Sequence, residues 1–325
     1  MYELATSTHL KYDKTGKAPF LQGVERIINA GFKNLDFNFL DMVDTPTEFL
    51  SDDYKEWIYK CREFVEARGA KWVQAHSVCT GLQKDSEQFM KNVKRSIECC
   101  SYLGIEWTVM HHVGDPIYSA GSNLSPLDFN LKMFDEFLET AEKYKVGLAI
   151  ENNTHFPFFV NGKFEESTED LINLVDKLGS EYVGICWDVG HANINHVFRN
   201  AENLTHQSEQ LKLIGNRLKA THIHDNNAAM AGRNAGIKLD GTGINPILAF
   251  DEHIQPYMGT VDWEDVIQGL DAINYNHYFT YEAHRAINSL PDELVDSALV
   301  HLRKIGEHLV STSILPIFCA RTINS

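Results

Sequence analysis

Eight short apolar runs recur along this 325-residue chain, mostly about 30 to 40 residues apart, and stretches of helical periodicity with charged faces separate them. The runs cover residues 4–7, 34–37, 72–76, 107–111, 147–151, 183–188, 220–224 and 277–282. The clearest helical stretches cover residues 54–68, 85–103, 127–144, 168–178, 263–272 and 291–309. A strand followed by a helix, repeated eight times, predicts an α/β fold of the (β/α)8 TIM-barrel type.

The predicted barrel forms one domain over residues 1–309, because a chain with 43% hydrophobic residues can bury a core of that size. Residues 310–325 show no periodicity, and we assign this C-terminal tail no role. The interval before the last apolar run is the longest and contains a segment rich in Asn, Ala and Gly at residues 226–243. Long loops often carry function, so we expect a lid or a specificity loop there.

Charge and composition disfavour several classes of partner. The chain carries 29 Lys and Arg against 45 Asp and Glu, a net charge of −16, which opposes binding to a nucleic-acid backbone. No apolar run approaches the roughly 20 residues of a membrane-spanning helix. The six cysteines form no Cys-x-x-Cys pair, which suits reduced thiols that act in packing. We therefore expect a cytoplasmic protein without a membrane or nucleic-acid partner.

Five of the apolar runs lead into side chains that can bind a metal ion. These side chains are His111 and His112, Glu151, Asp188, His222 and Glu282. In a closed parallel barrel all strand C-termini open on one face, so these distant residues should converge there. A charge at the end of a buried strand must be paired, solvated or bound to metal. The pattern therefore predicts a metal site lined by carboxylates and imidazoles.

Each of these ligands has an ordinary structural alternative. A buried salt bridge is the alternative for Glu151. A helix cap is the alternative for Asp188, which precedes Gly190 at a strand-to-helix turn. His222 and His224 would share one side of the strand if the strand continued. We favour His222 as the ligand because the chain is expected to turn before His224.

Five segments, most of which hold these side chains, resemble motifs of the xylose-isomerase-like TIM barrels, a family that includes D-tagatose 3-epimerase, inosose-processing enzymes and endonuclease IV. The motifs are Ile-Glu-Asn at 150–152, Asp-Val-Gly-His at 188–191, His-Ile-His-Asp at 222–225, Met-Gly-Thr-Val-Asp-Trp at 258–263 and Tyr-Glu-Ala at 281–283. The resemblance covers residues 1–309 and implies a TIM barrel that binds one divalent metal ion. The metal ligands that it implies are Glu151, Asp188, His222 and Glu282.

The resemblance also implies residues that contact substrate or further metal ions. His191 matches a family position that contacts substrate or another metal. Endonuclease IV holds a trinuclear zinc cluster with further histidines and an Asp-x-His pair. The counterparts of these residues in this chain are His76, His112, Asp251 and His253.

Two positions depart from the pattern of the ketose epimerases. Pro157 stands where those enzymes have a glutamate, six residues after Glu151. Ala228 stands where they have an arginine, six residues after His222. Arg233 could take over a substrate contact, and an exposed loop arginine is the alternative. The substrate contacts of the family therefore do not carry over as a set.

The implied ligand set of three carboxylates and one imidazole suits manganese, magnesium or cobalt and tolerates zinc. Such an ion can chelate adjacent sugar oxygens and polarise a carbonyl, which lowers the cost of removing the neighbouring C–H proton. Glu151 and Glu282 would flank the resulting enediolate as catalytic bases. The resemblance thus implies a metal-dependent isomerase or epimerase of a small-molecule sugar, sugar phosphate or polyol, and it leaves a homo-oligomer open.

Two other functions stay open from the sequence. An endonuclease IV-like phosphodiesterase acting on apurinic DNA is favoured by the extra histidines and opposed by the acidic charge. A barrel that binds sugar without turnover is opposed by Glu151 and Glu282, because a pure binder needs no proton-transfer pair.

Overall fold

The computed structural model describes residues 2–10, 20–43, 47–78, 87–112, 124–153, 167–199, 206–227 and 251–312. Its centre is a parallel sheet of eight strands in the order β7-β6-β5-β4-β3-β2-β1-β8. The strands are β1 (Glu3–Ser7), β2 (Asn34–Asn38), β3 (Lys71–His76), β4 (Trp107–His111), β5 (Gly147–Glu151), β6 (Val183–Asp188), β7 (Leu218–His222) and β8 (Tyr278–Tyr281). Ile223 closes the sheet by donating to Thr280 O at 2.8 Å and accepting from the Glu282 N–H at 3.0 Å. The predicted TIM barrel is therefore confirmed.

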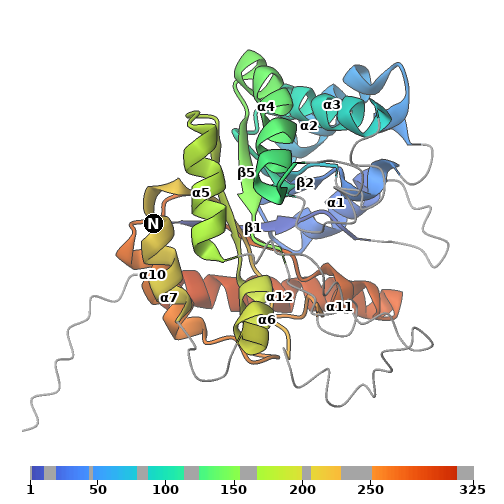
Figure 1. Cartoon of the computed structure of the whole chain (residues 1–325). Helices are drawn as coiled ribbons and strands as arrows, with labels where there is room; N and C mark the ends of the chain where they lie inside the picture. The colour runs from blue at the N-terminus through green and yellow to red at the C-terminus, as the bar shows by residue number, and fades with distance from the viewer. Residues whose placement is uncertain are drawn as a thin grey trace, which may run out of the picture.

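Helices surround the barrel (Figure 1). They are α1 (Phe20–Asn29), α2 (Tyr54–Glu66), α3 (Glu87–Leu103), α4 (Pro126–Tyr144), α5 (Thr168–Leu178), α6 (Val189–Arg199), α7 (Gln207–Ile214), α10 (Trp263–Ala272), α11 (His284–Asn288) and α12 (Asp292–Thr312). Three short 3-10 turns are η1 (Leu40–Val43), η2 (Glu48–Leu50) and η3 (Gly215–Arg217). In the segments that the structure describes, no helix combines the length and apolar character that a membrane span requires.

Several predicted element boundaries differ from those in the structure, and two differences bear on the barrel. β7 ends at His222 rather than at residue 224, because Ile223 pairs with Tyr281 of β8 and Asp225 forms an antiparallel bridge. α12 continues to Thr312, three residues past the predicted end of the barrel domain, and its residue Leu309 is buried in the core. Helices α1, α6, α7 and α11 lie outside the clearest helical stretches of the sequence. Residues 313–325 lie outside the described residues.

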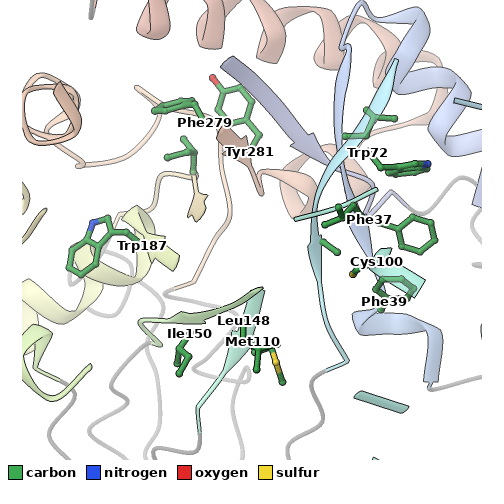
Figure 2. Close-up of a cluster of buried hydrophobic side chains, with 14 of the residues drawn as sticks. Phe37, Phe39, Trp72, Cys100, Met110, Leu148, Ile150, Trp187, Phe279 and Tyr281 are labelled. Carbon is green, nitrogen blue, oxygen red and sulfur yellow. The ribbon is translucent and has the colours of Figure 1, made fainter. Parts of the chain in front are cut away.

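The main apolar core lies between the outer face of the barrel and the helices. Its large side chains include Phe37, Trp72, Leu148, Ile150 and Phe279 (Figure 2). A smaller cluster fills the barrel interior and consists of Val109, Ala149, Cys186 and Ala220. On β5, Leu148 and Ile150 thus point outward while Ala149 points inward. Glu151, two residues after Ala149, therefore points into the barrel at its C-terminal mouth.

The four cysteines within the described residues are free and buried. They are Cys61, Cys99, Cys100 and Cys186. Burial raises the pKa of all four thiols above the ordinary value. Because the thiolate is the reactive form, these residues are poor nucleophiles and serve as packing residues.

Candidate metal and substrate site

Four of the predicted ligands converge at the C-terminal mouth of the barrel. They are Glu151 of β5, Asp188 of β6, His222 of β7 and Glu282 just after β8, and each is at most 5% exposed. His222 Nδ1 lies 2.9 Å from Glu151 Oε1, 3.6 Å from Glu282 Oε2 and 4.0 Å from Asp188 Oδ2. Three carboxylates thus surround one imidazole, and we call these four residues the floor group.

The floor group holds ionised carboxylates in a buried place. Burial alone would raise the pKa of Glu151, but His222 and His111 lower it well below its usual range. Burial alone would also raise the pKa of Glu282, but His222 and His253 lower it to about 2. Burial would lower the pKa of His222, but Glu151 and Glu282 raise it to about 10. The carboxylates therefore require a cation among them, which is either an imidazolium or a metal ion.

The two carboxylate oxygens of Asp188 have different surroundings. Its Oδ1 accepts from the His191 N–H at 2.6 Å and so caps the first turn of α6. Its Oδ2 is buried and has no hydrogen-bond partner within the described part of the chain. A buried carboxylate oxygen without a partner is costly, so a metal ion at Oδ2 would stabilise this arrangement.

A second group of ligand atoms adjoins the floor group. It comprises His191, His224, Asp251 and His253, whose ligand atoms lie within 4.8 Å of one another. Asp251 Oδ2 lies 3.0 Å from His253 Nε2. Asp251 Oδ1 lies 3.6 Å from His191 Nε2 and 3.7 Å from His224 Nε2, and among the described residues it has no hydrogen-bond partner. We call these four residues the side group.

Main-chain carbonyls orient three of the imidazoles. The pairs are His76 Nδ1 with Ser77 O at 2.9 Å, His191 Nδ1 with Asn152 O at 2.8 Å, and His253 Nδ1 with Glu282 O at 2.6 Å. A carbonyl oxygen only accepts, so each Nδ1 donates its proton to it and each Nε2 is left toward the cavity. In the side group Asp251 Oδ2 also only accepts, so His253 Nε2 donates to it at 3.0 Å, and a metal ion bound there would replace that proton. Histidines held in this way are typical of metal ligands.

His111 of β4 forms a third group of candidate ligand atoms with His76 and Glu151. His111 Nε2 lies 2.9 Å from Glu151 Oε2 and 3.2 Å from His76 Nε2. Both His111 and His112 are candidate ligands in the sequence, and the family resemblance implies a contact for His112. On β4 the inward positions are Val109 and His111, so the structure places His111 against the cavity and leaves His112 out of its lining.

Asp225 positions the 258–263 motif beside β7. Its Oδ1 accepts from the Val261 N–H at 3.1 Å, and its Oδ2 accepts from Trp263 Nε1 at 3.0 Å. Gly259 lies so close that a Cβ there would collide with the Asp225 carboxylate. Gly190 makes room for the His224 ring in the same way. These two motif glycines thus allow the close packing that brings the side group together.

A cavity of about 520 Å³ opens above these groups. Of the residues predicted to contact substrate, His76, His191, Asp251 and His253 line it. Arg233 and most of the predicted lid at 226–243 lie outside the described residues. The cavity is also lined by residues that the sequence analysis did not single out, namely His9, Leu40, His284, Arg285, Asn288 and Ser289.

Comparisons with known proteins agree with this architecture. An uncharacterised protein of Methanocaldococcus jannaschii is 24% identical over 253 residues, which are 76% of this chain and 75% of that protein. The structure of a D-tagatose 3-epimerase-like protein is 20% identical, with a TM-score of 0.64 over 96% of this chain and 98% of its own. The IOLI protein, solved with a zinc atom, is 17% identical, with a TM-score of 0.63 over 97% of this chain and 100% of its own. The model of one family matches residues 24–305, and the chain belongs to that family, the xylose isomerase-like TIM barrels.

Proposed function

We propose that this chain is a divalent-metal-dependent isomerase or epimerase of a small sugar, sugar phosphate or polyol, acting by proton transfer through an enediolate. The observation that carries the proposal is the approach of two ionised glutamates, Glu151 and Glu282, to His222 at 2.9 and 3.6 Å beneath the cavity. A volume of about 520 Å³ matches a small-molecule ligand. The shared fold with a D-tagatose 3-epimerase-like protein supports the same class of substrate.

The floor group fits a divalent ion by its own chemistry. It supplies three carboxylates and one imidazole, and the buried Asp188 Oδ2 has no hydrogen-bond partner in the segments described. Such a set suits manganese, magnesium or cobalt and tolerates zinc. The zinc atom in the IOLI structure supports a divalent ion in this fold. When bound, the ion would act as a Lewis acid toward a sugar carbonyl.

The two glutamates divide the proton transfer between them. Glu151 follows β5 and Glu282 follows β8, so their carboxylates reach a sugar in the cavity from different strands. One carboxylate removes the proton beside the carbonyl and the other returns it, which inverts that carbon. Return of the proton to the adjacent carbon, with transfer of the hydroxyl proton between the two enediolate oxygens, converts an aldose into a ketose or the reverse. Acid–base catalysis of this kind contributes about 10² to 10⁴-fold.

Glu151→Gln and Glu282→Gln test these roles, because an amide keeps the size of the carboxylate but loses its basicity. Each variant should exchange the substrate C–H proton with solvent deuterium at least about 100-fold more slowly than the unaltered protein. Metal content is measured in the same samples, since both residues are also proposed ligands. Glu264→Gln, at an exposed position of α10, is the control. A variant that retains its metal and exchanges at the original rate removes that glutamate from the mechanism.

A second candidate is an endonuclease IV-like metal-dependent phosphodiesterase acting on apurinic DNA. The observation that favours it is the adjacency of several candidate ligand groups, because two or more ions can stabilise both the attacking and the leaving oxygen of a phosphoryl transfer. The net charge of −16 opposes it. Chelator-sensitive cleavage of an oligonucleotide with one abasic site would support the phosphodiesterase. Intact oligonucleotide after incubation with metal-loaded protein would eliminate it.

A further inference from the structure

The cavity has a wall that differs in charge from its floor. Among the described residues, this wall consists of His9, His284, Arg285, Asn288 and Ser289 and has no acidic residue, whereas the carboxylates that line the cavity belong to the floor and side groups. Four of the wall residues follow Glu282 closely along α11 and the turn after it. A sugar whose carbonyl end lies at the floor group would therefore present another part of its structure to this wall.

Arg285 is the one Lys or Arg among the described residues that line the cavity. Its Nη1 donates to the main-chain oxygen of Asp251 and, at 3.2 Å, to Asp251 Oδ2. These bonds fix the orientation of the guanidinium, while the side chain stays 36% exposed. Within the described part of the chain Nε and Nη2 have no partner. A guanidinium with two free donors in a fixed plane is suited to an oxyanion.

His284 provides an independent sign of a ligand beside Arg285. Its ring is 7% exposed and lines the cavity, and its Nδ1 has no hydrogen-bond partner among the described residues. The ring stacks on His9, with centroids 3.9 Å apart and an interplanar angle of 13°. An imidazole carries an N–H in either tautomer, so this ring has a donor to offer a ligand in the cavity.

The charge of the cavity depends on how many ions it holds. The floor and side groups together contain four carboxylates, those of Glu151, Asp188, Asp251 and Glu282. One divalent ion would leave the cavity negative even with Arg285. Two divalent ions, one in each group, would neutralise the carboxylates and leave Arg285 as an unbalanced positive charge. An anionic ligand would then be attracted to the wall.

We propose that the substrate carries an oxyanion, either a phosphate monoester or a carboxylate, and that Arg285 and His284 bind it at the cavity wall. This inference rests on the proposed function, which leaves the charge of the sugar open. It assigns Arg285 and His284 as residues that determine substrate specificity.

Calorimetric titration of the protein with its metal ions tests the proposal with three ketoses that share their first five carbons. These are D-fructose, D-fructose 6-phosphate and D-fructuronate. At least one of the two anionic ketoses should bind roughly 10- to 100-fold more tightly than D-fructose. The tighter of the two identifies the oxyanion as phosphate or carboxylate. Equal binding of all three, or no binding of any, would overturn the proposal.

Substitutions of Arg285 and His284 test whether the wall causes the tighter binding of the anionic ketose. Arg285→Met and His284→Asn should each weaken the anionic ketose about tenfold or more and leave D-fructose within about twofold, while Arg285→Lys should restore part of the preference. Lys60→Met, which removes an exposed charge on the outer helix α2, should change nothing. Metal content is measured throughout, because Arg285 also holds Asp251. Equal weakening of all three ketoses at unchanged metal content would overturn the assignment.

Solvent-deuterium exchange on the same ketoses separates this proposal from the proposed function. A binding preference that depends on Arg285, without exchange on any ketose, would contradict the isomerase and leave the oxyanion site standing. Deuterium exchange on the ketoses, without tighter binding of the anionic ones, would support the isomerase and overturn the oxyanion site.

Discussion

The side chain of Asn152 makes two hydrogen bonds with the main chain of Asp188: Oδ1 accepts from the Asp188 N–H at 2.6 Å, and Nδ2 donates to the Asp188 carbonyl at 2.9 Å. The Asn152 carbonyl also accepts from His191 Nδ1 at 2.8 Å. Asn152, directly after β5, therefore positions Asp188 of the floor group and His191 of the side group.

Asn152→Ala should weaken metal binding by about 10- to 100-fold, as expected for loss of a residue that orients metal ligands. The free energy of unfolding should fall by about 1 to 3 kcal/mol, because buried main-chain groups of Asp188 lose their partners. Metal titration and urea unfolding measure the two effects. Asn153→Ala is the control, since the Asn153 side chain donates to the His112 carbonyl at 3.3 Å. Unchanged metal affinity in the Asn152 variant would show that Asp188 and His191 keep their positions without the Asn152 side chain.

His111 and His112 are neighbours in sequence that should respond differently to substitution. His111→Asn should lower metal content or affinity, because His111 Nε2 lies 2.9 Å from Glu151 Oε2 at the cavity. His112→Asn should leave both unchanged, since His112 does not line the cavity. Elemental analysis of the two purified variants measures their metal content and so tests this difference. Equal metal loss in both would contradict the placement of these side chains.

The fold and the floor group were predictable because both depend on local patterns. An apolar run that ends in a charged residue indicates where a strand reaches the barrel mouth. This signal lies within one segment of the sequence and does not depend on the residues that the strand pairs with. The run that ends at Glu151 corresponds to β5, and the run that ends at Asp188 corresponds to β6, with the predicted bounds. Parallel strands of a closed barrel then bring such ends together.

Other parts of the site depend on features that the sequence does not display. A buried parallel strand such as β4 is apolar on both faces, so no alternation indicated whether His111 or His112 points inward. The end of β7 depends on pairing between Ile223 and Tyr281, which are far apart in the chain. Arg285 lies on α11, which has 5 residues and is too short to show helical periodicity.

Outside the site, Glu98 of α3 should make the stability of the protein sensitive to acid. It accepts from Tyr54 at 2.8 Å and Tyr102 at 2.6 Å and pairs with Lys55 at 2.8 Å. Burial alone would raise the pKa of Glu98, but Lys55 and the tyrosines lower it from 4.5 to about 2. A carboxylate with a lowered pKa stabilises the folded state above the unfolded pKa, and this stabilisation is lost as the pH falls through the folded pKa.

Glu98→Gln should therefore lower the free energy of unfolding by roughly 1 kcal/mol at neutral pH. The difference from the unaltered protein should shrink as the pH falls from 4.5 toward 2. Urea unfolding at several pH values measures it. Glu87→Gln, at an exposed position of the same helix, should show no such trend. A difference that stays constant across this range would contradict the role of Glu98.

In the proposed mechanism, the floor-group glutamates and a divalent ion exchange the C–H proton beside a sugar carbonyl. Proton NMR in deuterium oxide tests it most directly, with a panel of ketoses and ketose phosphates and with protein as purified, after chelation, and after metal is restored. The signal of that proton should decay with the purified protein, persist after chelation and decay again once manganese, magnesium or cobalt is added. Decay that continues in protein shown by elemental analysis to be free of metal, or no decay with any sugar in fully loaded protein, would contradict the claim.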